Sequence, residues 1–377
     1  MSGAASPGLV LLPQWRILYG GSQTDITKDL ATNFKELRFD DEIGKKATSL
    51  KLYFANNLST ATQLGMEANP PGVGQTLSAS IGYQNQALTS IGSFEVDEYE
   101  FEGPPHVFII KTIQAGITQA LRTLRSVAYE GQTLTSIAKT VAARQGLTAT
   151  TDAVSPDVPY QRLTQNHESD LVFLHRIAGQ HGYDFQIRDK NMVFYSRTAI
   201  EDSAAAGVLV KSGGTIKHYR FTNQTLKHKT YAASEVGHWS PVSKQFLVSQ
   251  ATAANAAGTD TLRARERVEN SQQASVKAAA YLHDANMLGV RAEIEVIGNP
   301  LYRAGRTLTI NGFGLFDQIT WTVEKAEHRL DRQGYLTRLH LRNALSKTGS
   351  VGPVYLPTSP QFKASQAAAT KAGLPAP

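Results

Sequence analysis

Short runs of alternating apolar and polar residues recur along the chain and predict a mainly β fold. In residues 290–297 apolar positions alternate with charged ones, and the same period of two returns at 307–310 and 319–324. Such alternation puts one face of a strand in a core and the other in water or against a polar partner. Segments rich in Gly, Asn and Asp at 311–314 and 331–334 separate the runs as turns. Several short strands with such turns indicate a barrel or a sandwich.

The strand pattern occurs twice, in the same order. An Asn-Pro turn, a Gly and a strand that begins with Thr-Leu at Thr76 recur at Thr307. Each copy continues with an aromatic residue, Val and two acids at the same spacing, starting from Phe94 and from Trp321. An extended segment precedes each copy and a further strand closes it. We interpret this order as an internal duplication of a small antiparallel β unit, with the Thr76 and Thr307 strands equivalent.

Between the two copies the apolar period changes to that of amphipathic helices. The first helix has Thr133 as its N-cap and Gly146 as its stop. The second is capped by Asn166 or Ser169, ends at Gly182 and is followed by a hairpin. This part of the chain therefore predicts an α+β module inserted between two β units.

The predicted fold class is α+β, mainly β, with two similar β-barrel domains. We expect the first barrel in residues 1–117 and the inserted module in 118–200. The second barrel, with a helix that stops at Gly289, occupies 201–345, and a tail rich in Pro and Ala occupies 346–377.

Composition narrows the class of protein. The chain has 377 residues, enough for two to three domains, and a net charge of only +6 without a dense Lys or Arg run, so no specific nucleic-acid binding is expected. It has no cysteine, which excludes disulfides and thiolate chemistry. The apolar run at 9–12 is too short and lacks the basic leader of a signal peptide, and no stretch approaches the ~20 apolar residues of a membrane span. We expect the chain to fold in a cytoplasm.

Two groups of residues are candidates for chemistry, and neither has a catalytic pattern. His167, His175 and His181 are spaced by eight and six residues, not by the four of a helical metal site, and are expected to be surface or packed histidines. The carboxylates between Glu95 and Glu102 lie on a predicted strand and are expected to form a solvated or partner-facing edge. Phosphate-loop and nucleophile-elbow motifs are absent from the sequence. We therefore expect no enzyme, no catalytic or metal residue and no cofactor.

Several segments resemble one known family in the same order. Residues 94–112, 121–126 and 130–147 resemble the late-control gene D proteins of contractile-tailed phages, the baseplate hub family. Residues 168–185 are similar to a segment that this family shares with the valine-glycine repeat spike proteins of type VI secretion, and 298–343 resembles the family's closing domain. The resemblance runs from about Ile17 to Asn343. Triple-stranded β-spike repeats do not follow it, so the needle would be a separate polypeptide.

The resemblance implies a structural hub of a contractile tail baseplate. Family hubs are trimers whose two tube-type barrels per chain make a ring of six, which joins a hexameric tail tube to a trimeric spike. A duplicated unit is a physical solution to that change of symmetry. The implied partners are two further copies of the chain, the tail tube protein and the spike protein, with tape measure and baseplate wedge proteins as further candidates. The implied location is the tail baseplate of a virion or tail-like particle, assembled in the cytoplasm of a bacterial host.

Two alternatives come from other functional classes. Residues 127–147 resemble a lysin motif, so the chain could bind peptidoglycan through a lysin-motif-like module. A tail-associated wall-degrading enzyme with the acidic strand as its site is the third possibility. A peptidoglycan-binding assay distinguishes a peptidoglycan-binding protein from a structural hub. The enzyme hypothesis would require that turnover is lost after Glu98→Gln.

The tail has the composition of an extended segment that docks on a partner. Residues 346–377 contain five prolines, three lysines and no acidic side chain. Its apolar anchors are Val354, Tyr355, Leu356 and Phe362, which we predict to dock on the spike protein.

Overall fold

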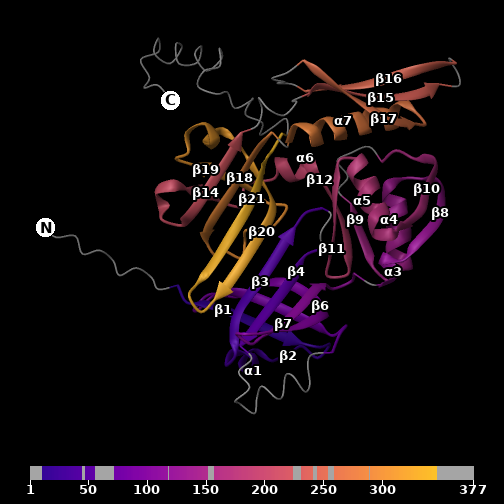
Figure 1. Ribbon diagram of the computed structural model, residues 1–377. Helices are drawn as coiled ribbons and strands as arrows, with labels where there is room; N and C mark the ends of the chain where they lie inside the picture. The colour runs from indigo at the N-terminus through magenta and orange to yellow at the C-terminus, as the bar shows by residue number, and fades with distance from the viewer. Residues whose placement is uncertain are drawn as a thin grey trace, which may run out of the picture.

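The computed structural model describes residues 11–44, 47–55, 72–117, 119–151, 157–223, 231–240, 244–253, 259–287 and 289–345. Most elements in these residues are strands, and a few helices cover them (Figure 1). This confirms the predicted fold class, α+β and mainly β. The first Asn-Pro turn, at 69–70, lies outside the described residues. None of the described helices has the length and apolar character needed to span a membrane.

The first part of the chain forms a strand-rich unit, which we call the first unit. Its elements are β1 Pro13–Tyr19, β2 Thr24–Asp25, α1 Thr27–Ala31, β3 Phe34–Glu42, β4 Ser49–Ala55, β5 Thr76–Tyr83, β6 Thr89–Glu102 and β7 Val107–Gln114. Its strands pair in the order β3-β4-β7-β6-β5-β1-β2 around a core that includes Phe39, Phe54 and Phe94.

The last described part of the chain forms a second unit with the same strand order. Its elements are β13 Val208–Val210, the 3₁₀ helix η1 Lys211–Gly213, β14 Ile216–Asn223, β18 Val290–Ile297, β19 Thr307–Asn311, the 3₁₀ helix η2 Gly314–Gln318, β20 Trp321–Asp331 and β21 Tyr335–Asn343. Its strands pair in the order β14-β18-β21-β20-β19, with β13 beside β19. Five strands of each unit therefore correspond one to one.

The correspondence extends to single residues. Register places Val96 opposite Thr112 and Val323 opposite Leu341, and each Val is followed by a β-bulge. The N–H of Gly74 donates to the carbonyl of Val96 over 2.7 Å, and Gly305 makes the same bond to Val323 over 3.0 Å. Leu77 pairs with Phe94, and Leu308 pairs with Trp321. The β5 and β19 strands are thus equivalent, as the repeated sequence pattern predicts.

The two units share one sheet, because β20 pairs antiparallel with β3. His328 lies opposite Phe39 in this register, and their rings stack with centroids 5.4 Å apart. Figure 1 shows the long yellow strands β20 and β21 running into the indigo strands of the first unit. We call the β20–β3 contact the within-chain junction.

The inserted module follows the first unit. Its elements are α3 Gln119–Arg122, β8 Leu124–Gln132, α4 Leu134–Arg144, β9 Thr148–Thr151, β10 Tyr160–Ser169, α5 Asp170–Gln180, β11 Tyr183–Arg188, β12 Asn191–Ser196 and α6 Arg197–Asp202. Thr133 caps α4 and Ser169 caps α5, as predicted, because each side-chain oxygen accepts from an otherwise unpaired backbone N–H. The predicted hairpin is β11–β12, in which Arg188 lies opposite Asn191.

A separate three-stranded sheet, which the sequence pattern did not indicate, belongs neither to the sheet of the two units nor to the inserted module, and we call it the third sheet. It consists of β15 Tyr231–Ser240, β16 Gln245–Thr252 and β17 Asp260–Val268, in the order β16-β15-β17. The predicted helix before Gly289 is α7 Ser271–Met287, whose Ala274 and Ala278 pack against Val236 and Val268 of this sheet. In Figure 1 α7 runs beneath the sheet, on the side of the inserted module.

Our division into two tube-type barrels and an inserted module, with its boundaries, stays a prediction.

Candidate functional site

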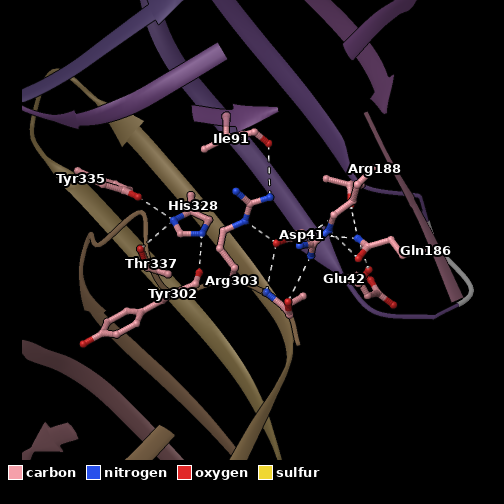
Figure 2. A network of polar contacts seen from close by, with 12 residues as sticks. Asp41, Glu42, Ile91, Gln186, Arg188, Tyr302, Arg303, His328, Tyr335 and Thr337 are labelled. Atoms are coloured by element: carbon pink, nitrogen blue, oxygen red, sulfur yellow. Dashed lines mark hydrogen bonds and ion pairs between the residues drawn. The ribbon is translucent and has the colours of Figure 1, made fainter. Parts of the chain in front are cut away.

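The most extensive buried polar contacts surround Asp41, at the end of β3 (Figure 2). The Nε of Arg303 donates to one carboxylate oxygen over 2.6 Å, and the N–H of Ala304 donates to the same oxygen over 3.2 Å. Gln186 and Arg188, both on β11, reach the other oxygen over 3.3 and 3.4 Å. Asp41 therefore connects the first unit with the second unit and with the inserted module.

The charge balance around Asp41 keeps it ionised. Burial alone would raise the pKa of this fully buried carboxyl, but the guanidinium groups of Arg188 and Arg303 outweigh burial and hold its pKa below the usual value. A buried carboxylate with two cations and several donors is compensated, whereas an unpaired one would be strongly unfavourable. The arrangement suits a carboxylate that links parts of the structure and not one that donates a proton.

His328 of β20 lies beside this cluster and is fully buried (Figure 2). Burial first, and then the nearby Arg303, lower the pKa of His328 to about 4, so the ring is neutral at pH 7. Its Nε2 donates to the carbonyl of Tyr302 over 2.9 Å, and its Nδ1 accepts from the hydroxyl of Tyr335 over 2.8 Å. Both ring nitrogens are thus used within the second unit.

A second buried ionic cluster joins the inserted module to the second unit. Asp184 of β11 accepts from Nε of Arg197 and from Nη2 of Arg342, each over 2.9 Å. Arg197 also pairs with Asp284 of α7. Burial would raise the pKa of Asp184, but the two arginines hold it below its usual value.

The third sheet, together with α7, makes a further connection to the inserted module. Glu266 of β17 accepts from Lys277 over 2.6 Å and from Gln180 of α5 over 3.3 Å. The carboxylate of Glu269 accepts from the backbone N–H groups of Gln161 and Arg162, over 2.7 and 3.1 Å. The inserted module is therefore tied to the first unit, the second unit and the third sheet by separate sets of polar contacts.

These clusters can hold the units and the inserted module in place through buried ion pairs whose charges neutralise each other. Within the described ranges no group of three or more His, Asp or Glu side chains is placed to hold a metal ion. What the clusters do is join the first unit, the second unit and the inserted module to one another.

The three candidate histidines make unrelated contacts. His167 is exposed and its Nδ1 lies 3.1 Å from the hydroxyl of Ser126, whereas the His175 ring packs edge-on against Phe185. His181 is buried 2.5 Å from the hydroxyl of Tyr160, and burial and then Lys277 lower its pKa to about 4.

The acidic strand is the second half of β6 and is largely exposed, as the sequence predicts. Glu98 lies 3.6 Å from the ammonium of Lys111, and Glu100 hydrogen-bonds to the same group. Glu95 accepts from the N–H of Gly116 over 3.2 Å. These contacts are those of a strand edge: Glu98 and Glu100 share the ammonium of Lys111, and Glu95 accepts from a backbone N–H.

The remaining sequence candidates, Val354, Tyr355, Leu356 and Phe362, lie outside the described residues, so spike docking stays a prediction. Sequence reasoning missed Asp41, Arg188 and Arg303. One signal for Asp41 was available: it follows Leu37 and Phe39 at a period of two, on the apolar face of its strand. An acid at such a position requires a buried cationic partner.

The lysin-motif-like segment differs from a self-contained module. It holds one helix, α4, and its flanking strands pair elsewhere: β8 with β10, and β9 in parallel with β12. A cleft of about 620 Å³ lies between α7 and the end of α5, lined by residues such as Val158, His181 and Val276. No residue of 127–147 lines this cleft. Peptidoglycan binding through the segment therefore gains no support from the structure.

Two curated proteins are similar to the chain over most of its length. A probable baseplate hub protein of Escherichia phage 186 is 24% identical over 362 residues, which span 85% of the chain and 91% of the relative. A probable baseplate hub protein of Escherichia phage P2 is 25% identical over 379 residues, which span 90% and 95%. A scan against protein-family models found no match.

Solved structures share the fold. The 43 kDa tail protein of prophage MuSo2 from Shewanella oneidensis matches with a TM-score of 0.64 at 15% identity, over 91% of the chain and 99% of the tail protein. The Escherichia coli c3393 protein, described as a type VI secretion component similar to phage T4 tail proteins gp27 and gp5, matches with a TM-score of 0.54 at 10% identity, over 85% and 76%. The fold is thus that of phage tail and related secretion proteins. The predicted resemblance to the baseplate hub proteins is confirmed.

Proposed function

We propose that the chain is the structural hub of a contractile tail baseplate, in a phage or a tail-like injection particle. The observation that carries the proposal is its similarity, over 85–90% of its length, to two proteins named as probable baseplate hub proteins. At this level the predicted structural, non-enzymatic role is confirmed, and the finer statements below are proposals.

The proposed assembly is a trimer whose six units form a ring. One side of the ring faces the hexameric tail tube, and the other holds the trimeric spike. The register-level equivalence of the two units supports this proposal, because three chains with two equivalent units each present six similar surfaces. The within-chain junction and the Asp41 cluster supply the fixed relation between units that such a ring requires.

The proposed location is the tail baseplate of the particle. There the chain would contact the tail tube protein and the spike protein, with tape measure and baseplate wedge proteins as further candidates. The genes beside the gene of this chain would identify the kind of particle that contains it.

The test is co-expression with the tube and spike proteins encoded beside this chain. We expect a complex with three copies of the chain that carries the spike on one side and nucleates tube on the other, visible by electron microscopy. Particles assembled without the chain should lack the spike. A chain that stays monomeric with both proteins, or spike-bearing particles in its absence, would contradict the proposal.

A further inference from the structure

The second half of β6 has an open side where its equivalent in the second unit is paired. Along residues 325–331, β20 pairs with β21 on one side and with β3 on the other. β6 pairs with β7 up to Glu102, but its pairing with β5 ends at Glu95. The backbone of Val96 still bonds to Gly74 and Gln75 on that side, but among the described strands none pairs with the other side of residues 98–102.

β14 has the complementary open side. Its equivalent, β3, pairs with β4 on one side and with β20 on the other. β14 ends the order of the large sheet and, among the described strands, pairs with β18. The chain thus contains one complete junction, β20 with β3, and the two separate halves of a second one, β6 and β14.

We infer that residues 98–102 of β6 in one copy pair antiparallel with β14 of the next copy and repeat the within-chain junction. The inference rests on the trimeric ring proposed above, because a ring of equivalent units needs the same contact between chains as within a chain. The occupant of each open edge is therefore a second copy of this chain.

Burial at the equivalent positions fits this pairing. At the within-chain junction Ala326, His328 and Leu37 are 0%, 1% and 0% exposed. Their equivalents on the open edges are Tyr99, Phe101 and Tyr219, which are 39%, 48% and 43% exposed. Large aromatic side chains standing exposed along an open strand edge mark an interaction surface, since solvent-facing edges are normally short, charged or covered.

The charges of the two edges are complementary. The open half of β6 is acidic, with Asp97, Glu98, Glu100 and Glu102. β14 is basic, with Lys217 and Arg220 exposed and His218 beside them. Oppositely charged edges favour pairing between β6 and β14 and disfavour the pairing of either edge with itself.

The register follows from the equivalence. Within the chain, His328 lies opposite Phe39 and Arg329 opposite Arg38. Transferred to the open edges, these pairs become Phe101 with Phe221 and Glu102 with Arg220 of the next copy. The first pair repeats the ring stack of His328 on Phe39, and the second brings opposite charges together.

A double-cysteine variant tests this register directly, because the chain has no cysteine of its own. Directly opposed residues of antiparallel strands have Cα atoms about 4.5–5.5 Å apart, within the range of a disulfide. Glu102→Cys with Arg220→Cys should give disulfide-linked dimers and trimers under mild oxidation and no larger species. The control combines Glu102→Cys with Lys217→Cys, which lies three residues, about 10 Å, out of register and should stay uncrosslinked.

Light scattering on the same samples, with and without the spike protein, distinguishes a failure of the strand pairing from a failure of the trimer. A trimer that gives no more crosslink than the control would overturn the pairing and leave the hub proposal standing. A monomer in both conditions would overturn the ring and the pairing together. Crosslinked species that grow beyond three copies would indicate an open filament and would also overturn the closed pairing.

Discussion

The carboxylate of Asp41 accepts a 2.6 Å hydrogen bond from Arg303, a residue 262 positions further along the chain. The contact joins the first unit to the second, and Arg188 adds the inserted module over 3.4 Å. One buried carboxylate thus relates three parts of the molecule, and its removal should affect all of them together.

Asp41→Asn should lower the free energy of unfolding by about 3 kcal/mol, the lower end of the range for breaking a buried ion pair. The lower end applies because the side chains of Arg303 and Arg188 are 18% and 29% exposed and keep some water. The neighbouring Asp40→Asn, which removes a 3.8 Å contact to Lys325, is the control and should cost less than about 1 kcal/mol. Denaturant unfolding measures both variants, and equal losses would contradict a special role for Asp41.

Stability should fall as the pH drops from about 6.5 to 4, because of the two buried histidines. Burial first, and then a nearby cation, lowers the pKa of His181 and of His328 to about 4, whereas an unfolded histidine titrates near 6.5. In this window the unfolded chain binds protons that the folded chain does not, so acid favours unfolding by roughly 2–3 kcal/mol per histidine. The lowered pKa of Asp41 adds a loss only below about pH 4.

The matched variants for this pH effect are His328→Gln and His167→Gln. Gln at 328 keeps a neutral hydrogen-bonding side chain but cannot titrate, so the slope of stability against pH should flatten. His167 is exposed, and its replacement should leave the slope unchanged. Unfolding free energies at pH 7, 6 and 5 measure the slope, and an unchanged slope in His328→Gln would show that this ring is not responsible.

Charge reversal on β14 should weaken the contact between copies. Arg220→Glu places an acid opposite Glu102 in the inferred register, and with one such pair per junction the trimer's dissociation constant should rise on the order of tenfold. The double variant Glu102→Arg with Arg220→Glu restores opposite charges and should recover most of the affinity. Arg162→Glu, an equal charge change on the exposed side of the inserted module, is the control. Sedimentation measures all three, and no recovery in the double variant would count against the register.

The repeat in the sequence predicted much of the β architecture, because alternation and turn residues are local signals. The strands from Thr76 and Thr307 are equivalent as expected, and Thr133 and Ser169 cap their helices. Local patterns do not say which strands of different units pair. The β20–β3 junction joins strands far apart in the chain, so no local pattern indicates that the units share one sheet.

The buried junctions were missed for a related reason. Arg188, Arg303 and Arg342 look like ordinary surface arginines in the sequence, and only the fold brings them to Asp41 and Asp184. The third sheet was missed because β16 is exposed along most of its length and lacks the alternation of a half-buried strand. Exposed Phe246, Leu247 and Val248 follow one another there.

Purified protein should neither bind nor hydrolyse peptidoglycan. The lysin-motif-like segment lacks a self-contained strand pair, and Glu98 and Glu100 are engaged with Lys111. Co-sedimentation with peptidoglycan sacculi and release of soluble sugars measure the two activities. Glu98→Gln is the control for hydrolysis: release of sugars by the natural chain, lost in this variant, would establish the wall-degrading alternative.

The last prediction concerns the tail, residues 346–377, which lies outside the described residues. Its five prolines work against a long helix or a central strand, and its few large apolar residues cannot form a core. An extended, proline-stiffened segment loses little entropy on docking, and Val354, Tyr355, Leu356 and Phe362 supply anchors for a groove or a sheet edge. The tail follows β21 of the second unit, and we expect it to dock on the spike protein of the proposed hub assembly. Deletion of 346–377 should then weaken co-purification with the spike, and replacement of the four anchors by Ser should do the same while keeping the tail's length and lysines. The natural tail should also resist proteolysis once the spike is bound. If the truncated hub binds the spike as tightly and the tail remains protease-sensitive in the complex, the docking hypothesis is wrong.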